Sequence, residues 1–134
     1  MRNAEQILAE STTIAVVGAS RDPGKEAHTV PRQMQRHGWT IIPVNPYATE
    51  LFGVPCYRTL ADIPVHVDMV NVFRPSADCA EVARQAVEIG ADSIWLQQDI
   101  ASPEARAIAE AAGIDYVEDH CIAVERAIRA LSKL

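Results

Sequence analysis

The stretch that decides the fold runs from Thr13 to Lys25 and reads TIAVVGASRDPGK. Its first five residues form an unbroken apolar run rich in β-branched side chains, which is typical of a strand buried on both faces of a parallel sheet. Gly18 ends this run, and glycine readily takes a positive φ and lets a ligand approach the backbone closely. Small, polar and basic residues follow. The pattern predicts a buried strand that turns sharply into a loop.

The residues after this glycine suit an anion. Ala19 and Ser20 place little side chain in the way, while Arg21 and Lys25 bring positive charge. If a helix follows, its free N–H groups and its dipole face the same spot, which makes a binding site for phosphate. We therefore interpret this stretch as the nucleotide-binding start of a Rossmann-like domain. The alternative is a tight strand-to-helix turn without any ligand.

Two common phosphate-binding motifs are incomplete here. In the dinucleotide fingerprint G-x-G-x-x-G, the second and third glycines would stand where Ser20 and Pro23 are, and no Walker A loop can be aligned. An NAD-binding domain also carries an acid at the end of its second strand, where the carboxylate holds the ribose hydroxyls. The corresponding residues 43–46 read PVNP and contain no carboxylate. Both departures count against NAD as the ligand. Asn45 could still form a hydrogen bond with an adenine or ribose edge. The alternative is that Asn45 and Pro46 simply form a turn.

Strands and helices alternate along the rest of the chain. Strands are expected at residues 39–44, 67–73, 93–96 and 114–117, helices at residues 1–10, 29–37, 79–89, 102–113 and 119–134, and an irregular crossover at residues 50–57. Local signals set the helix starts. Pro31 is expected in a first turn, Asp78 as an N-cap with Glu81 in capping-box position, Ser102 as an N-cap before a proline, and Asp119 as the last cap.

This alternation with short links predicts the α/β class. We expect a Rossmann-like three-layer sandwich with a five-stranded parallel sheet in the order 3-2-1-4-5, numbered along the chain, and a single domain over residues 1–134. Ligands of such sheets bind beyond the C-terminal strand ends, at the switch point beside the first strand. The loops at residues 18–25, 43–47 and 73–75 should meet there.

Composition narrows the function. The 134 residues are 49% hydrophobic and 22% charged, as in ordinary soluble globular proteins. The net charge of −6, without a cluster of Lys and Arg, speaks against nucleic acid. No apolar run is long enough to cross a membrane, and the start lacks a signal-peptide core. The three cysteines form no disulfide or metal pattern and indicate reduced thiols in a cytoplasmic protein.

His120 and Cys121 are the one candidate pair for nucleophilic chemistry. A helix N-terminus and a neighbouring imidazolium both lower the pKa of a thiol. Adjacent residues on a helix do not face each other, however, so a buried structural cysteine is the favoured interpretation. We find no paired acids or metal-like cluster at the strand ends, and therefore predict neither catalytic residues nor a metal site.

Several motifs resemble the stand-alone CoA-binding domain proteins. They are IAVVGAS at 14–20 with Pro23 and Lys25, PVNP at 43–46, GVPCY at 53–57, Val67-Asp68, VFR at 72–74, WLQ at 95–97, and DHCI at 119–122. That family is similar to the N-terminal CoA-binding domain of the succinyl-CoA synthetase alpha subunit. The motifs follow the family's order and span nearly the whole chain. The resemblance implies that CoA or an acyl-CoA is the ligand.

The resemblance also implies a set of contact residues. It assigns Gly18, Ala19, Ser20, Arg21 and Lys25 to the CoA phosphates, Val44, Asn45, Pro46 and Tyr47 to the nucleotide, and Phe73 and Arg74 to the pantetheine. Two places depart from the family pattern. Gln98-Asp99 stands where the family usually has glycine, and Pro75-Ser76 replace further polar, often basic residues. These departures concern the far end of the expected pocket.

Three functions follow from these observations. The first is a CoA or acyl-CoA binding module without catalysis of its own and with an unknown protein partner. The second is an NAD(P)-linked oxidoreductase with a degenerate fingerprint. The third is the CoA-binding piece of a split acyl-CoA ligase whose other domains, absent from this chain, come from another chain. The missing acid after the second strand and the missing catalytic constellation favour the first.

Overall fold

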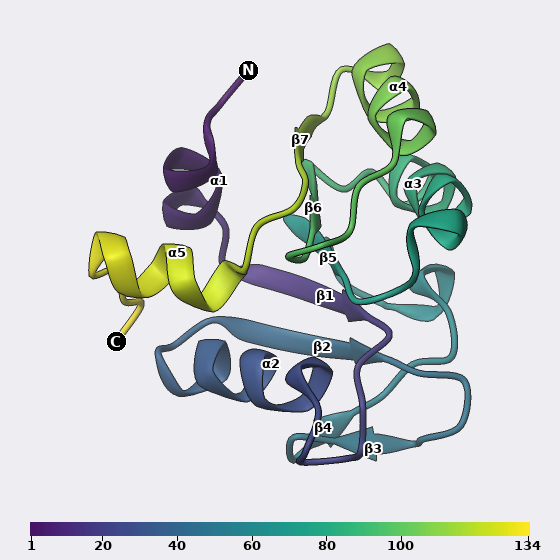
Figure 1. Ribbon diagram of the computed structural model, residues 1–134. Helices are drawn as coiled ribbons and strands as arrows, with labels where there is room; N and C mark the ends of the chain where they lie inside the picture. The colour runs from purple at the N-terminus through teal and green to yellow at the C-terminus, as the bar shows by residue number, and fades with distance from the viewer.

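The computed structural model describes all 134 residues and contains a five-stranded parallel sheet (Figure 1). Its strands are β1 (Thr13–Val17), β2 (Thr40–Val44), β5 (Met69–Val72), β6 (Ser93–Leu96) and β7 (Asp115–Val117), in the order β2-β1-β5-β6-β7. A separate antiparallel hairpin joins β3 (Glu50–Leu51) and β4 (Val54–Pro55) where the sequence indicated an irregular crossover. The predicted α/β, Rossmann-like class is confirmed.

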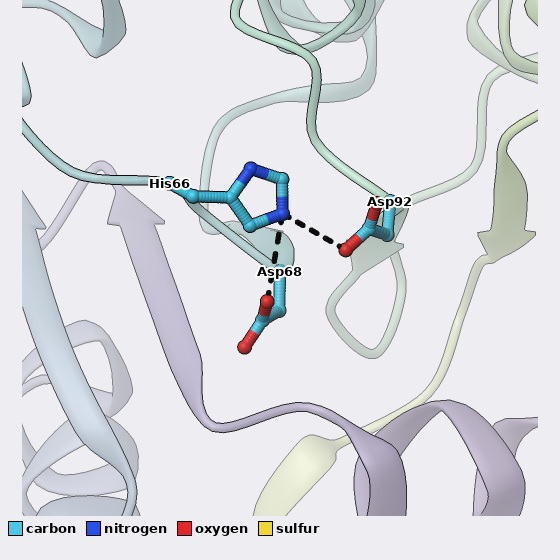
Figure 2. A group of neighbouring side chains, drawn as sticks. All are labelled: His66, Asp68 and Asp92. Carbon is cyan, nitrogen blue, oxygen red and sulfur yellow. Dashed lines mark hydrogen bonds and ion pairs between the residues drawn. The ribbon is translucent and has the colours of Figure 1, made fainter.

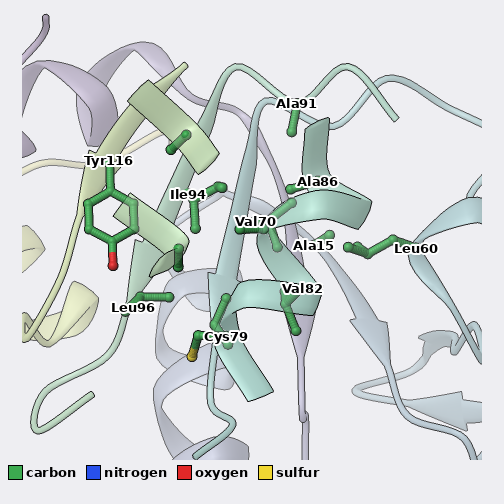
Figure 3. Packing of buried hydrophobic residues seen from close by; sticks show 14 of the residues in the cluster. Ala15, Leu60, Val70, Cys79, Val82, Ala86, Ala91, Ile94, Leu96 and Tyr116 are labelled. Carbon is green, nitrogen blue, oxygen red and sulfur yellow. The ribbon is translucent and has the colours of Figure 1, made fainter. Parts of the chain in front are cut away.

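Helices cover both faces of this sheet and complete three layers. They are α1 (Ala4–Glu10), α2 (Glu26–Arg36), α3 (Cys79–Glu88), α4 (Pro103–Ala112) and α5 (Ile122–Arg129), with short 3-10 turns η1 (Leu60–Asp62) and η2 (Ser76–Asp78). Helices α1, α2 and α5 share one apolar cluster with the sheet, and α3 and α4 share the other, part of which Figure 3 shows. None of these helices has the length and apolarity needed to cross a bilayer.

The strand order differs from the predicted 3-2-1-4-5. Numbered along the chain, the five strands of the sheet lie in the order 2-1-3-4-5, because β5 pairs with β1 on the side opposite β2. Pro43 gives a physical reason for placing β2 at the edge, since proline has no N–H for a second neighbour. Along its outer side β2 meets only the segment around Tyr57, whose N–H donates to the Pro43 carbonyl. The fully buried β5 takes a central position instead.

Two helix starts and one predicted capping box differ from the sequence predictions, whereas α3 begins at Cys79 as expected. Helix α2 begins at Glu26, so Pro31 lies inside it and not in its first turn. Asp78 makes no cap hydrogen bond, because its carboxylate pairs with Arg74, and the predicted capping box is wrong. Helix α5 begins after Cys121, while Asp119 accepts a hydrogen bond from the Asp99 N–H and does not cap the helix. Ser102 does cap α4, by accepting from the Ala105 N–H.

Candidate functional site

A cleft of about 750 Å³ opens at the C-terminal ends of β1, β2 and β5. These three strand ends are adjacent because β1 lies between the other two. Ten of the eleven site residues expected from the sequence line the cleft: Gly18, Ala19, Ser20, Lys25, Val44, Asn45, Pro46, Tyr47, Phe73 and Arg74. The eleventh, Arg21, is exposed and does not line it. The cleft therefore lies at the topological switch point, where open α/β sheets bind ligands.

Gly18 makes the turn at the base of the cleft. Its φ is +88°, and its N–H donates to the Val44 carbonyl at 3.2 Å. A Cβ at this position would lie 2.7 Å from the Phe73 carbonyl oxygen, a distance that would force the backbone apart. The space that a side chain of residue 18 would need is therefore filled by the loop after β5. The sequence correctly indicated that a glycine is required here, but the structure supplies a packing reason for it.

The loop after β1 is fastened to the first turns of α2 through Ser20. Its N–H donates to the Ala27 carbonyl at 3.1 Å, and its own carbonyl lies 2.7 Å from His28 Nδ1. In an unbroken helix the Ala27 carbonyl would accept from the residue four positions on, but that residue is Pro31, which has no N–H. The proline inside the helix thereby leaves an acceptor for the loop. Because the Ser20 N–H donates to this carbonyl, it is not free to bind a ligand.

Unpaired positive groups border the cleft. The backbone N–H groups of Ala19, Glu26 and Ala27 make no hydrogen bond within the protein, and the last two lie at the positive end of the α2 dipole. Lys25 and Arg58 line the cleft, and neither has a carboxylate within 4.0 Å. This combination of free N–H groups, helix dipole and unpaired cations is suited to phosphate.

Arg58 was missed by the sequence analysis. It directly follows the GVPCY motif, in a segment whose path between β2 and β5 has no helical or strand periodicity. The backbone pairing of Tyr57 with β2 brings Arg58 to the cleft. Arg32 donates to the Gln35 side chain and lies outside the cleft.

Asn45 at the end of β2 acts as a clamp between two loops. Its Nδ2 donates to the Ala19 carbonyl at 2.8 Å, and its Oδ1 accepts from the Tyr47 N–H at 2.7 Å. Both ends of the amide therefore have partners within the chain. The Tyr47 side chain that follows is 83% exposed at the rim of the cleft. No carboxylate stands at this strand end to hold a ribose in the manner of dinucleotide-binding domains.

Helix α3 forms the opposite wall, which the sequence analysis did not include. Glu81, Val82 and Gln85 of α3 line the cleft, together with Asp78 at the end of η2. Asp78 Oδ2 accepts from Arg74 Nη2 at 2.8 Å, so this arginine, unlike Lys25, already has a counter-ion. The helical spacing of these residues was visible, but only the packing of α3 against β5 shows that this face borders the cleft.

The candidate nucleophile lies elsewhere. No cysteine or histidine lines the cleft. Burial raises the pKa of the Cys56 and Cys79 thiols, which makes both less reactive at neutral pH. Cys121 occupies the N-cap position of α5, and His120 Nε2 lies 3.3 Å from Glu125 Oε2. Asp99 does not line the cleft either; its φ of +69° lies in the left-handed region that favours glycine.

The geometry defines an α/β domain with a cleft at its switch point, and the lining of this cleft is suited to an anion. Comparison with known proteins gives the family. Residues 12–127 match the CoA binding domain family, and the chain belongs to it. The uncharacterized protein YneT of Bacillus subtilis is 39% identical over 124 residues, which is 92% of each protein.

Two further comparisons agree with this assignment. Acetate–CoA ligase (ADP-forming) I of Archaeoglobus fulgidus is 35% identical over 75 residues, which cover 56% of this chain. The match covers only 10% of the ligase, so the chain corresponds to a small part of that enzyme. A solved structure from Thermus thermophilus is 35% identical and superposes with a TM-score of 0.89, covering 95% of this chain and 98% of the other. The chain is thus related to the CoA-binding part of ADP-forming ligases.

Proposed function

We propose that this chain, acting as one domain, binds CoA or an acyl-CoA in the cleft at the carboxyl end of the sheet. The observation that carries the proposal is the convergence of the expected residues with unpaired positive groups in one cleft of about 750 Å³. A cavity of that size suits a ligand larger than a lone phosphate. Membership of the CoA binding domain family supports CoA as the ligand. We propose a cytoplasmic protein, in keeping with its free thiols.

In this proposal the phosphates of CoA lie at the start of α2. The free N–H groups of Ala19 and Ala27 would donate to phosphate oxygens, and Lys25 and Arg58 would supply charge. Asn45 and Ser20 would act by holding the loops in place, since their polar groups already have partners. The local positive charge would offset the net charge of −6, which otherwise repels a polyanion.

NAD is the competing ligand, and the end of β2 argues against it. A dinucleotide site needs an acceptor for the ribose hydroxyls, which a carboxylate normally supplies. Here the strand end offers Asn45, whose side-chain oxygen already accepts from Tyr47. We therefore propose a binding module that prefers CoA to NAD. The relation to ligases leaves a second role, as the CoA-binding piece of a multi-chain ligase, to be tested by adding the missing domains.

Isothermal titration calorimetry with CoA and with NAD tests the ligand. We expect one CoA per chain and no heat from NAD at the same concentrations. Native mass spectrometry of the purified protein provides a second measurement, because tightly held CoA would travel with the chain. A micromolar NAD complex without a CoA signal would overturn the proposal.

A further inference from the structure

Three side chains with metal-ligating atoms meet at the amino ends of β5 and β6, which is the end of the sheet opposite the cleft. Figure 2 shows the His66 imidazole reaching toward the carboxylates of Asp68 and Asp92. His66 Nε2 lies 3.0 Å from Asp92 Oδ2 and 3.6 Å from Asp68 Oδ1. All three donor atoms lie within 4.8 Å of one another. The group draws on the segment before β5 and the start of β6.

The sheet itself fixes the two carboxylates. Asp68 and Asp92 directly precede β5 and β6, whose register pairs Met69 with Ser93. The Asp92 N–H donates to the Asp68 carbonyl, so the two backbones are joined at this level. Asp68 Oδ2 accepts from the N–H groups of Thr12 and Thr13, both at 2.9 Å, which orients the carboxylate and leaves Oδ1 toward His66. Such outer hydrogen bonds typically orient metal ligands.

The ion pairs of this group differ from the other ion pairs of the protein. Every other ion-paired carboxylate has an arginine within 4.0 Å, as Asp115 has Arg2 and Asp78 has Arg74. Asp68 and Asp92 have only the His66 ring nitrogen within 4.0 Å, and neither a lysine nor an arginine. A cation bound between the two carboxylates would supply a positive charge that no basic side chain supplies here.

We propose that His66, Asp68 and Asp92 bind a divalent transition-metal ion, with Zn²⁺ as the best-suited probe. Zinc accepts imidazole nitrogen and carboxylate oxygen at bond lengths of about 2.0–2.2 Å, which in tetrahedral geometry separates neighbouring donors by about 3.4 Å. The distances from His66 Nε2 to the two carboxylate oxygens, 3.0 and 3.6 Å, bracket this value. Water would complete the coordination, because His66 and Asp92 are both about half exposed.

Calorimetric titration of the intact chain with zinc chloride at pH 7.5 tests this site. We expect one zinc ion per chain with micromolar affinity. His66→Asn and Asp92→Asn should each weaken binding by about tenfold or more, since loss of even an outer partner costs that much. His37→Asn is the matched control, because His37 is not part of the group and its imidazole makes no hydrogen bond.

The three free thiols require a separate readout, because thiolates also bind zinc. Cobalt(II) added to the unmodified chain should show no sulfur-to-metal charge-transfer band, and the His66 ring nitrogens should shift in an NMR spectrum on adding zinc. Far-UV circular dichroism and the Tm check that each variant folds. Absence of zinc binding in the unmodified chain, or an isotherm identical in folded His66→Asn, overturns the proposal.

Discussion

Lys25 shows how one residue serves both the fold and the proposed ligand. Its carbonyl accepts from the N–H groups of His28 and Thr29 and so begins α2, while its side chain lines the cleft without a counter-ion. The backbone role survives replacement by almost any residue. A substitution of Lys25 therefore removes its positive charge and keeps the start of α2. Such a substitution tests phosphate binding without disturbing the helix.

Lys25→Ala should weaken CoA binding by about 1–3 kcal/mol, the value of a charge-assisted hydrogen bond. Because the side chain is exposed, the loss should shrink at high salt, where ions screen the charge. Calorimetry at two ionic strengths measures both effects. Arg21→Ala is the matched control, since Arg21 belongs to the same loop but lies outside the cleft, and it should cost less. Equal losses in both variants would contradict the placement of the phosphates.

Individual residues of the cleft could largely be predicted from the sequence, although some of their roles could not. Gly18 was expected to let a ligand approach, yet a Cβ there would strike the Phe73 carbonyl of a loop more than fifty residues away. Asn45 was expected as a ligand or a turn, and its amide joins Ala19 to Tyr47. Such roles depend on contacts between distant segments, which a local sequence pattern does not contain.

At the scale of elements, prolines explain the two main differences between prediction and structure. Pro31 was placed in a first turn because an interior proline costs a helix about 3 kcal/mol. The structure keeps it inside α2 and uses the freed Ala27 carbonyl to hold Ser20. Pro43 marked β2 as an edge strand, and reading it that way would have corrected the strand order. In both cases the missing N–H is the informative feature.

Pro31→Ala tests whether this missing N–H organises the loop. The new N–H at position 31 should compete for the Ala27 carbonyl and loosen its bond to Ser20. We expect faster hydrogen exchange of the Ser20 amide by NMR and weaker CoA binding, by about 1 kcal/mol for one hydrogen bond. Gln33→Ala, at an exposed position on the same helix, is the control and should change neither. An unchanged exchange rate of the Ser20 amide in folded Pro31→Ala would show that the loop keeps its conformation without the missing N–H of Pro31.

At the scale of the whole molecule, the parallel sheet separates two sets of functional groups. The carboxyl ends of β1, β2 and β5 border the cleft, and His66, Asp68 and Asp92 lie at the amino ends of β5 and β6. The sequence predicted the first set because its motifs follow strands directly. It did not predict the second, since Asp68 and Asp92 come together only through the register of β5 and β6. The observed strand order places β1, and not β2, at the centre of the three strands that border the cleft.

Hydrogen exchange over the whole chain, with and without CoA, tests this separation. A ligand that binds the native state protects the backbone that it contacts or orders. We expect CoA to slow exchange at residues 18–28, 45–47, 57–60 and 73–85, which border the cleft, and to leave residues 64–68 and 90–93 at the other edge unchanged. NAD at the same concentration is the control, and it should slow exchange neither at the cleft nor at residues 64–68 and 90–93. Protection that centres on residues 64–68 and 90–93, or that spreads evenly over the sheet, would place the ligand outside the cleft and contradict the proposed function. Protection confined to the cleft would instead identify the strand ends around β1 as the part of the molecule that recognises CoA.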